Sequence, residues 1–130
     1  MTRYLLDTHV WLWLQASPDR ISLDVLEQLA DDRNELLLSA ASAWEIAIKH
    51  ALGRLELPER PDRYVPDRMQ RSGVTGVPIE HRHALQVAEL PPHHRDPFDR
   101  LIVAQAQLLS TPVVTVDAAF DRYDVEVLRA

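Results

Sequence analysis

Four acidic residues, far apart in the sequence, have the side-chain type needed for a shared metal site: Asp7, Glu45, Asp99 and Asp117. They offer only oxygen ligands, which select hard cations such as Mg²⁺ and Mn²⁺ over zinc. The chain has no cysteine, so disulfides, thiolate metal sites and cysteine nucleophiles are excluded. The chemistry that these residues predict is that of a divalent cation held by carboxylates, provided that the fold brings them together.

Short apolar runs alternate along the chain with helical patterns. Strands are predicted at residues 3–6, 35–38, 77–79, 112–116 and 125–128, and helices at 8–15, 22–30, 42–52, 63–71, 80–90, 97–109 and, as a single turn, 118–123. Strands that alternate with helices form a parallel sheet with helices on both faces. The predicted fold class is α/β with three layers, and 130 residues suit a single domain, 1–130.

The predicted elements bring the four carboxylates to one edge of the sheet. Asp7 directly follows the first strand, and Asp117 directly follows the fourth. Glu45 lies in the first turns of the helix after the second strand, and Asp99 in the first turn of the helix before the fourth. Ligands of an open α/β sheet bind beyond the carboxyl ends of its strands, so we expect these side chains to share one site.

Each acid also has a purely structural interpretation. Ser42 and Glu45 have the spacing of a capping box, and the other three acids stand where they could cap a helix or face its positive end. Helix caps, however, have no reason to converge on one edge of a sheet. Carboxylates held together repel one another, and only Arg95 and Arg100 are candidate basic partners, so we expect a bound cation to compensate their charge.

Five stretches of the chain carry recognisable motifs: LLDTHVWLW at 5–13, SAASAWEIAIK at 39–49, GRL at 53–55, HHRDPFDRLIVAQA at 93–106 and TVD at 115–117. In this order they span nearly the whole chain and resemble the PIN-domain family. The resemblance is to the VapC-type ribonuclease toxins of bacterial toxin–antitoxin pairs in particular. The succession of motifs is far more specific than any one of them.

The resemblance implies a PIN-like sheet of five parallel strands in the order 3-2-1-4-5. It implies that Asp7, Glu45, Asp99 and Asp117 are the catalytic residues and metal ligands of an endoribonuclease that uses Mg²⁺, with Mn²⁺ able to substitute. It also implies a homodimer and a small cognate antitoxin that neutralises the toxin. Contact with DNA is expected only through that antitoxin.

Three residues near the acids are candidates for positioning substrate or water. Thr115 lies two residues before Asp117, and in a strand both side chains point the same way, so its hydroxyl could orient a carboxylate or water. Thr8 is placed to do the same beside Asp7, and Arg100 is the third candidate. Ordinary roles in a strand or a helix cap are an equally good interpretation of the two threonines.

Aromatic and histidine side chains near these motifs have structural interpretations. The tryptophans are expected to pack in the core or at a dimer interface rather than to stack on nucleobases; they are Trp11, Trp13 and Trp44. His93 and His94 lie in a polar loop before Asp96, which is expected to cap the next helix. Contact between these histidines and substrate phosphate is a secondary hypothesis.

Two other folds with acidic Mg²⁺ sites fit the residues less well. A phosphoaspartyl phosphatase needs a second aspartate two residues after the first, where this chain has His9. A receiver domain needs a lysine after its last strand, whereas the only lysine here is Lys49. A PIN-like or receiver-like domain that binds Mg²⁺ and partner proteins without cleaving RNA is the alternative function.

Composition narrows the remaining classes. The net charge is −6, from 14 Lys and Arg against 20 Asp and Glu, which disfavours binding of nucleic acid through a basic surface. It agrees with a site in which a cation carries the positive charge. No apolar run reaches the roughly 20 residues of a membrane span. Asp7 and His9 interrupt the apolar start of the chain, so no signal peptide is expected and a cytoplasmic protein is predicted.

Overall fold

A computed structural model describes all 130 residues. Its elements, with η for a 3-10 helix, are β1 (Arg3–Leu6), α1 (Thr8–Ala16), η1 (Pro18–Arg20), α2 (Leu23–Ala30), β2 (Glu35–Ser39), α3 (Ala40–Ala51), α4 (Pro61–Ser72), β3 (Val74–Val77), α5 (His81–Gln86), η2 (Val87–Glu89), α6 (Pro97–Leu109), β4 (Val113–Thr115), η3 (Ala118–Arg122) and β5 (Val127–Arg129). None of its helices combines the length and the apolar character that crossing a lipid bilayer requires.

The strands form one parallel sheet in the order β3-β2-β1-β4-β5, which confirms the predicted topology. β1 lies at the centre, with Leu5 opposite both Leu37 of β2 and Val113 of β4. A strand that is covered on both faces needs apolar residues at successive positions. The leucine run of β2 and the valine pair of β4 meet that need.

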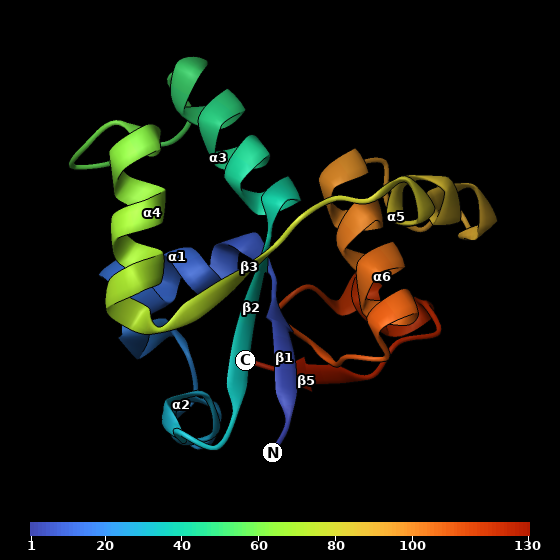
Figure 1. Cartoon of the computed structure of the whole chain (residues 1–130), viewed down its shortest axis with the longest axis horizontal. Helices are drawn as coiled ribbons and strands as arrows, with labels where there is room; N and C mark the ends of the chain where they lie inside the picture. The colour runs from blue at the N-terminus through green and yellow to red at the C-terminus, as the bar shows by residue number, and fades with distance from the viewer.

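Alternate side chains of the central strands enter two separate cores. Leu6 packs with α1, α2 and α4, where Trp11 is fully buried, whereas Leu5 packs with α6 and η3, where Phe120 is fully buried. Successive residues of a strand point to opposite faces, so the neighbouring residues Leu5 and Leu6 enter different cores. Figure 1 shows the result: α1, α2 and α4 on one side of the sheet, and α5 and α6 on the other. The three-layer arrangement is confirmed.

The third strand lies earlier than predicted. β3 occupies residues 74–77 rather than 77–79, because α4 ends at Gly73 in the left-handed conformation (φ 67°) and the chain turns straight into the sheet. Gly76, a weak strand former, pairs with Leu38 and hides the strand from pattern analysis. Pro78 has no backbone N–H to continue the ladder, so the strand stops before it.

Two helices begin earlier than predicted. α4 starts at Pro61, a residue that suits the first helical position because the N–H it lacks would have no partner there. The helix then continues through Pro66 with Tyr64 and Val65 buried beneath it. α3 starts directly after β2, and Ser39 is its N-cap. α3 therefore begins at the carboxyl end of β2, as seen in Figure 1.

Candidate metal centre

Asp7 stands where β1 ends, at the centre of the sheet, and is 3% exposed. Its backbone N–H donates to the carbonyl of Val114 (2.9 Å), and Thr115 Oγ1 donates to Asp7 Oδ2 (2.8 Å). The other oxygen, Oδ1, is buried without a hydrogen-bond partner. Burial raises the pKa of Asp7, and the Thr115 bond opposes that effect only in part. A buried oxygen with no donor is costly, and a bound cation would relieve the cost.

Thr115 connects Asp7 to the acid on the neighbouring strand. While donating to Asp7, its Oγ1 accepts a hydrogen bond from the backbone N–H of Asp117 (3.0 Å). Asp117 Oδ1 accepts from the N–H of Ala119 (2.9 Å) and so caps η3. Burial would raise the pKa of Asp117, but its bonds with His94 and Ala119 outweigh this and hold the pKa below its ordinary value. Asp117 is therefore both a cap and an ionised member of the site.

Glu45 extends from α3 and is paired with the only lysine of the chain. Lys49 Nζ lies 2.5 Å from Glu45 Oε2, one helical turn away, while Glu45 Oε1 is buried without a partner. Burial lowers the pKa of Lys49, but the bond to Glu45 and the charge of that acid outweigh it and leave the pKa raised. The expectation that only Arg95 or Arg100 could pair with the acids is therefore wrong.

The capping-box interpretation of Glu45 is also wrong. The N-cap of α3 is Ser39, whose Oγ accepts a backbone N–H two residues on at 3.0 Å. Ser42 instead is buried inside the first turns, where its Oγ accepts from Thr8 Oγ1 (2.8 Å). Both serines suit a cap by type, so the sequence alone does not distinguish them. The hydroxyl of Thr8 donates to Ser42 and so joins α1 to α3 rather than bonding to the Asp7 carboxylate; a role of Thr8 in positioning substrate or water stays a prediction.

The raised pKa of Asp99 is the clearest indication that the acids converge. Asp99 lies in the first turn of α6, three residues after Asp96, which caps that helix by accepting from the N–H of Phe98 (2.8 Å), as predicted. Burial first, and then the negative charges of Asp96 and of the three other acids of the site, raise the pKa of Asp99 to about 8. At neutral pH its carboxyl therefore retains a proton as long as no cation replaces it.

His94 is part of the site, although sequence reasoning gave it only a secondary role. Its Nε2 lies 2.9 Å from Asp117 Oδ2 and 4.0 Å from Asp99 Oδ2, and its side chain is 8% exposed. His93 instead packs edge-on against Tyr123, with 5.0 Å between ring centroids. The available signal was position: the loop at 91–95 leads directly into the start of α6, at the edge of the sheet where the acids lie.

Arg100 does not reach the acids, which corrects its expected place beside them. Its guanidinium donates to three backbone carbonyls, those of Pro91 (2.9 Å), Val87 (3.0 Å) and Leu90 (3.3 Å). These bonds tie the start of the loop that carries His94 to α6. Arg100 therefore acts on the loop, and any effect on the site is indirect.

The tryptophans differ in their surroundings. Trp11 is fully buried and packs edge-on against Tyr64 (6.2 Å between centroids), as expected for a core residue. Trp13 is half-buried, with the Arg20 guanidinium 5.3 Å from its ring centroid. Trp44 is 53% exposed and packs perpendicular to the ring of Phe98, with 4.9 Å between centroids. Core packing is therefore wrong for Trp44, which lies next to Glu45.

The chain as a whole matches a known family of domains. The profile of the PIN domain matches residues 4–126, a range that includes all four acids of the site. This chain belongs to the PIN-domain family. The resemblance noted in its motifs is thereby confirmed.

A curated relative of this PIN domain is Ribonuclease VapC16 of Mycobacterium tuberculosis (strain ATCC 25618 / H37Rv), 47% identical over 68 residues. The match covers 49% of this chain and 48% of the relative, so the aligned chain spans about half the length of that protein.

Solved structures share the fold of this PIN domain. VapBC2 from Rickettsia felis, bound to a DNA fragment from its promoter, has a TM-score of 0.74 at 16% identity and 98% coverage of both chains. DNA-bound VapBC from Salmonella typhimurium has a TM-score of 0.72 at 16% identity, covering 99% of this chain and 98% of that chain. At these identities the likeness shows the fold alone, and it agrees with the α/β architecture described above.

The side chains of the PIN domain fit a divalent cation. Two buried oxygens, Asp7 Oδ1 and Glu45 Oε1, have no donor, and burial together with the neighbouring negative charges raises the pKa of Asp99 to about 8. Ligand atoms of His94, Asp99 and Asp117 all lie within 4.8 Å of one another. Carboxylate oxygens that lack basic partners suit Mg²⁺ or Mn²⁺. Asp7 and Glu45 lie outside this cluster of three, but their charges act on Asp99. We call the five side chains together the metal centre: Asp7, Glu45, His94, Asp99 and Asp117.

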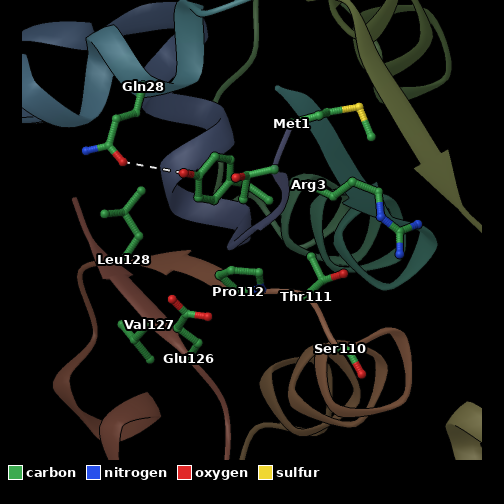
Figure 2. A pocket seen from close by; sticks show the side chains of 11 residues that line it. Met1, Arg3, Gln28, Ser110, Thr111, Pro112, Glu126, Val127 and Leu128 are labelled. Atoms are coloured by element: carbon green, nitrogen blue, oxygen red, sulfur yellow. Dashed lines mark hydrogen bonds between the residues drawn. The ribbon is translucent and has the colours of Figure 1, made fainter. Parts of the chain in front are cut away.

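The cavities of the PIN domain lie at both edges of the sheet. A cavity of about 480 Å³ opens at the amino ends of β1, β4 and β5, lined in part by Arg3, Gln28 and Glu126, as Figure 2 shows. The carboxylates lie at the opposite edge of the sheet, so this cavity is remote from them. A smaller cavity of about 220 Å³ between α1 and α3 includes Glu45 and Lys49 in its wall. Of these two cavities, the smaller one has a residue of the metal centre in its wall.

Proposed function

We propose that this PIN domain, residues 1–130, is the toxin of a type II toxin–antitoxin pair and cleaves RNA as a metal-dependent endoribonuclease. The observation that carries the proposal is the meeting of four acids at one sheet edge, with two buried oxygens unpartnered and the pKa of Asp99 raised to about 8. Family membership supports it, as do a relative named a ribonuclease and folds shared with VapBC proteins. Because its proposed substrate is RNA, we propose that the protein acts in the cytoplasm.

The proposed catalytic residues are Asp7, Glu45, Asp99 and Asp117. The three aspartates would hold the cation, and Glu45 would bind it directly or through water, or position the nucleophile. A bound Mg²⁺, or Mn²⁺ in its place, lowers the pKa of water and neutralises charge on the scissile phosphate. Thr115 holds Asp7 Oδ2 in place through its hydroxyl, which leaves Asp7 Oδ1 free to accept a ligand bond.

The remaining side chains adjust charge at the metal centre. Lys49 neutralises one oxygen of Glu45, so the acids repel one another less than four unpaired charges would. Asp99 must lose its proton before it can act as a ligand, and an approaching cation favours that loss. The acidic protein surface needs no basic groove, because the phosphate is drawn to the metal centre itself.

Purified protein is expected to cleave RNA with Mg²⁺ or Mn²⁺ and to stop when EDTA removes the ion. The cognate antitoxin should suppress this cleavage, for instance by pairing an arginine with the carboxylates. Sequencing of RNA ends after expression, beside an Asp7→Asn control purified in the same way, identifies the substrate and excludes contaminating nucleases. Undiminished cleavage in EDTA that is absent from the Asp7→Asn preparation would contradict the proposal.

We further propose that the domain is a homodimer, and that DNA is contacted only through the antitoxin. Two helices are poor candidates for its interface, because α1 has Trp11 turned into the core and α4 has Tyr64 and Val65 turned inward. Trp44 is the most exposed of the tryptophans and is therefore the one best placed to contact a second copy.

Sedimentation equilibrium is expected to give twice the 14.9 kDa of one chain, and Trp44→Ala is expected to weaken the dimer. Truncating a buried interface tryptophan typically raises the dissociation constant by about tenfold or more. Leu23→Ala is the control, because Leu23 is 77% exposed on α2, which Figure 1 shows at the end of the molecule opposite to α3. A monomer at all concentrations would overturn the proposed dimer.

A further inference from the structure

The ring of His94 is held more firmly than that of an ordinary loop histidine. It stacks on Tyr123 with 5.4 Å between centroids and 4° between planes, and it meets Phe120 edge-on at 4.9 Å. Both aromatic rings are themselves buried. Arg100 fastens the start of the same loop through its three carbonyl bonds. Packing on two sides therefore fixes the direction in which the nitrogens of His94 point.

The two nitrogens of His94 face different partners. Nδ1 lies 3.0 Å from the hydroxyl of Tyr123, and Nε2 lies 2.9 Å from Asp117 Oδ2. A phenol hydroxyl both donates and accepts, so the ring proton can occupy either nitrogen. In the metal-free protein Nε2–H donates to Asp117. When the proton instead lies on Nδ1 and is donated to Tyr123, Nε2 can present its lone pair to a cation. That is the arrangement of metal-binding histidines, which donate their other ring N–H to a fixed acceptor.

The distances around Nε2 match those between ligands of one ion. Ligands about 2.1 Å from an octahedral ion lie roughly 3.0 Å apart when adjacent and roughly 4.2 Å apart when opposite. His94 Nε2 lies 2.9 Å from Asp117 Oδ2 and 4.0 Å from Asp99 Oδ2. The unpartnered buried oxygens of Asp7 and Glu45 are an independent indication of a cation.

We propose that His94 Nε2 is a ligand of the metal ion, together with Asp99 and Asp117, and that it shifts the preference of the centre from Mg²⁺ toward first-row transition ions such as Mn²⁺. Mg²⁺ prefers oxygen ligands, whereas an imidazole nitrogen suits transition ions better. Tyr123 supports the ligand by accepting the proton of Nδ1. The inference rests on the metal centre of the proposed function, but metal binding tests it, so a failure to cleave RNA is a separate result.

The test measures Mn²⁺ bound to the whole chain, without RNA. Electron spin-echo envelope modulation of bound Mn²⁺ is expected to show coupling to a ¹⁴N nucleus, and His94→Gln is expected to abolish it. Glutamine can still hydrogen-bond to Asp117 but supplies no imidazole nitrogen. The substitution should weaken Mn²⁺ binding by at least about tenfold and Mg²⁺ binding by less than about threefold, judged by the usual cost of disturbing a ligand shell.

Three further variants separate a ligand from a merely structural residue. His93→Gln, a matched change one residue away, should leave the ¹⁴N coupling and both affinities unchanged. Tyr123→Phe keeps the stacking but removes the acceptor, so the coupling should persist while Mn²⁺ binding weakens by about tenfold. Asp99→Asn should abolish binding of both ions, which assigns the bound ion to this centre.

Bound Mn²⁺ with no ¹⁴N coupling in the wild type would overturn the inference, and that measurement needs no variant to fold. Equal weakening of Mn²⁺ and Mg²⁺ binding by His94→Gln would also overturn it, because His94 would then only hold Asp117. The same holds if Asp99→Asn leaves the coupled Mn²⁺ in place. Circular dichroism of each variant confirms that the compared proteins are folded.

Discussion

Asp99→Asn is expected to lower the rate of RNA cleavage by at least about 100-fold, whereas Asp96→Asn is expected to leave it within a few-fold of the wild type. Loss of a ligand removes charge stabilisation worth several kcal/mol in the transition state. The negative charges of all the other acids of the site raise the pKa of Asp99. Asp96 instead uses its Oδ1 to cap α6 through the N–H of Phe98, a bond that asparagine also makes.

The two substitutions are a matched pair. Each replaces one carboxyl group by an amide at the same end of α6 and changes the side chain by one atom. Asparagine and aspartate are about equally good N-caps, so Asp96→Asn keeps the helix start intact. kcat/KM with Mg²⁺ and the melting temperature of each variant should be measured together. Comparable losses of activity at both positions, with both proteins folded, would show that the acid facing the metal has been misassigned.

Much of the fold could be predicted because its strands are buried on both faces. Strands of three to five residues, each containing two or three successive leucines or valines and separated by helical patterns, indicate a parallel sheet. β3 was predicted wrongly because it is an edge strand that contains Gly76 and stops at Pro78. Its place is determined by pairing with β2 and by the end of α4, neither of which leaves an alternating pattern in the sequence.

The acids of the site could be predicted because topology alone brings them together. Asp7 and Asp117 end neighbouring strands, and the helices that carry Glu45 and Asp99 begin at the same edge. Lys49 was missed although the signal was present: it follows Glu45 by four residues on one helix, a spacing that places both on one face.

His94 illustrates the limit of sequence reasoning at this site. Nothing local indicates that it faces Asp117 rather than solvent. Its direction depends on Tyr123 and Phe120, which lie more than 20 residues further along the chain, and on the carbonyl bonds of Arg100. Contacts that form only after α6 and η3 pack together cannot be read from spacing.

The metal-free protein is expected to lose stability as the pH rises from about 4 to about 8, and Asp99→Asn is expected to remove most of that loss. The pKa of Asp99 is about 8 in the folded protein and near 3.8 when the group is unperturbed, as in the unfolded chain. Between these values the folded state keeps a proton that the unfolded state has released. Each pH unit therefore lowers the free energy of unfolding by up to about 1.4 kcal/mol.

The sign follows from which state binds more protons. Below about pH 4 both states are protonated at Asp99 and stability is complete, and above about pH 8 both are ionised and the full penalty is reached. The raised pKa of Asp7 acts in the same direction. The lowered pKa of Asp117 acts in the opposite direction, but only in acid, where its contribution is lost as the pH falls below its unfolded value. The loss of stability near neutral pH is therefore due mainly to Asp99.

Melting temperatures in EDTA between pH 5 and pH 8 measure this effect. Wild type and Asp99→Asn should differ least at pH 5, where only about the first pH unit of the loss has occurred, and the variant should melt roughly 5–15 °C higher at pH 8, as several kcal/mol produce in a domain of this size. Asp96→Asn should retain most of the wild-type dependence of melting temperature on pH.

At pH 8, Mg²⁺ at a hundredfold excess over its dissociation constant should stabilise the wild type by about 2.7 kcal/mol and Asp99→Asn far less. If Asp99 serves only the positive end of α6, its loss costs about 0.3–1 kcal/mol at every pH. A variant that melts lower than the wild type at pH 8 in EDTA, with an unchanged response to Mg²⁺, would show that the acids do not form a repulsive cluster awaiting a cation.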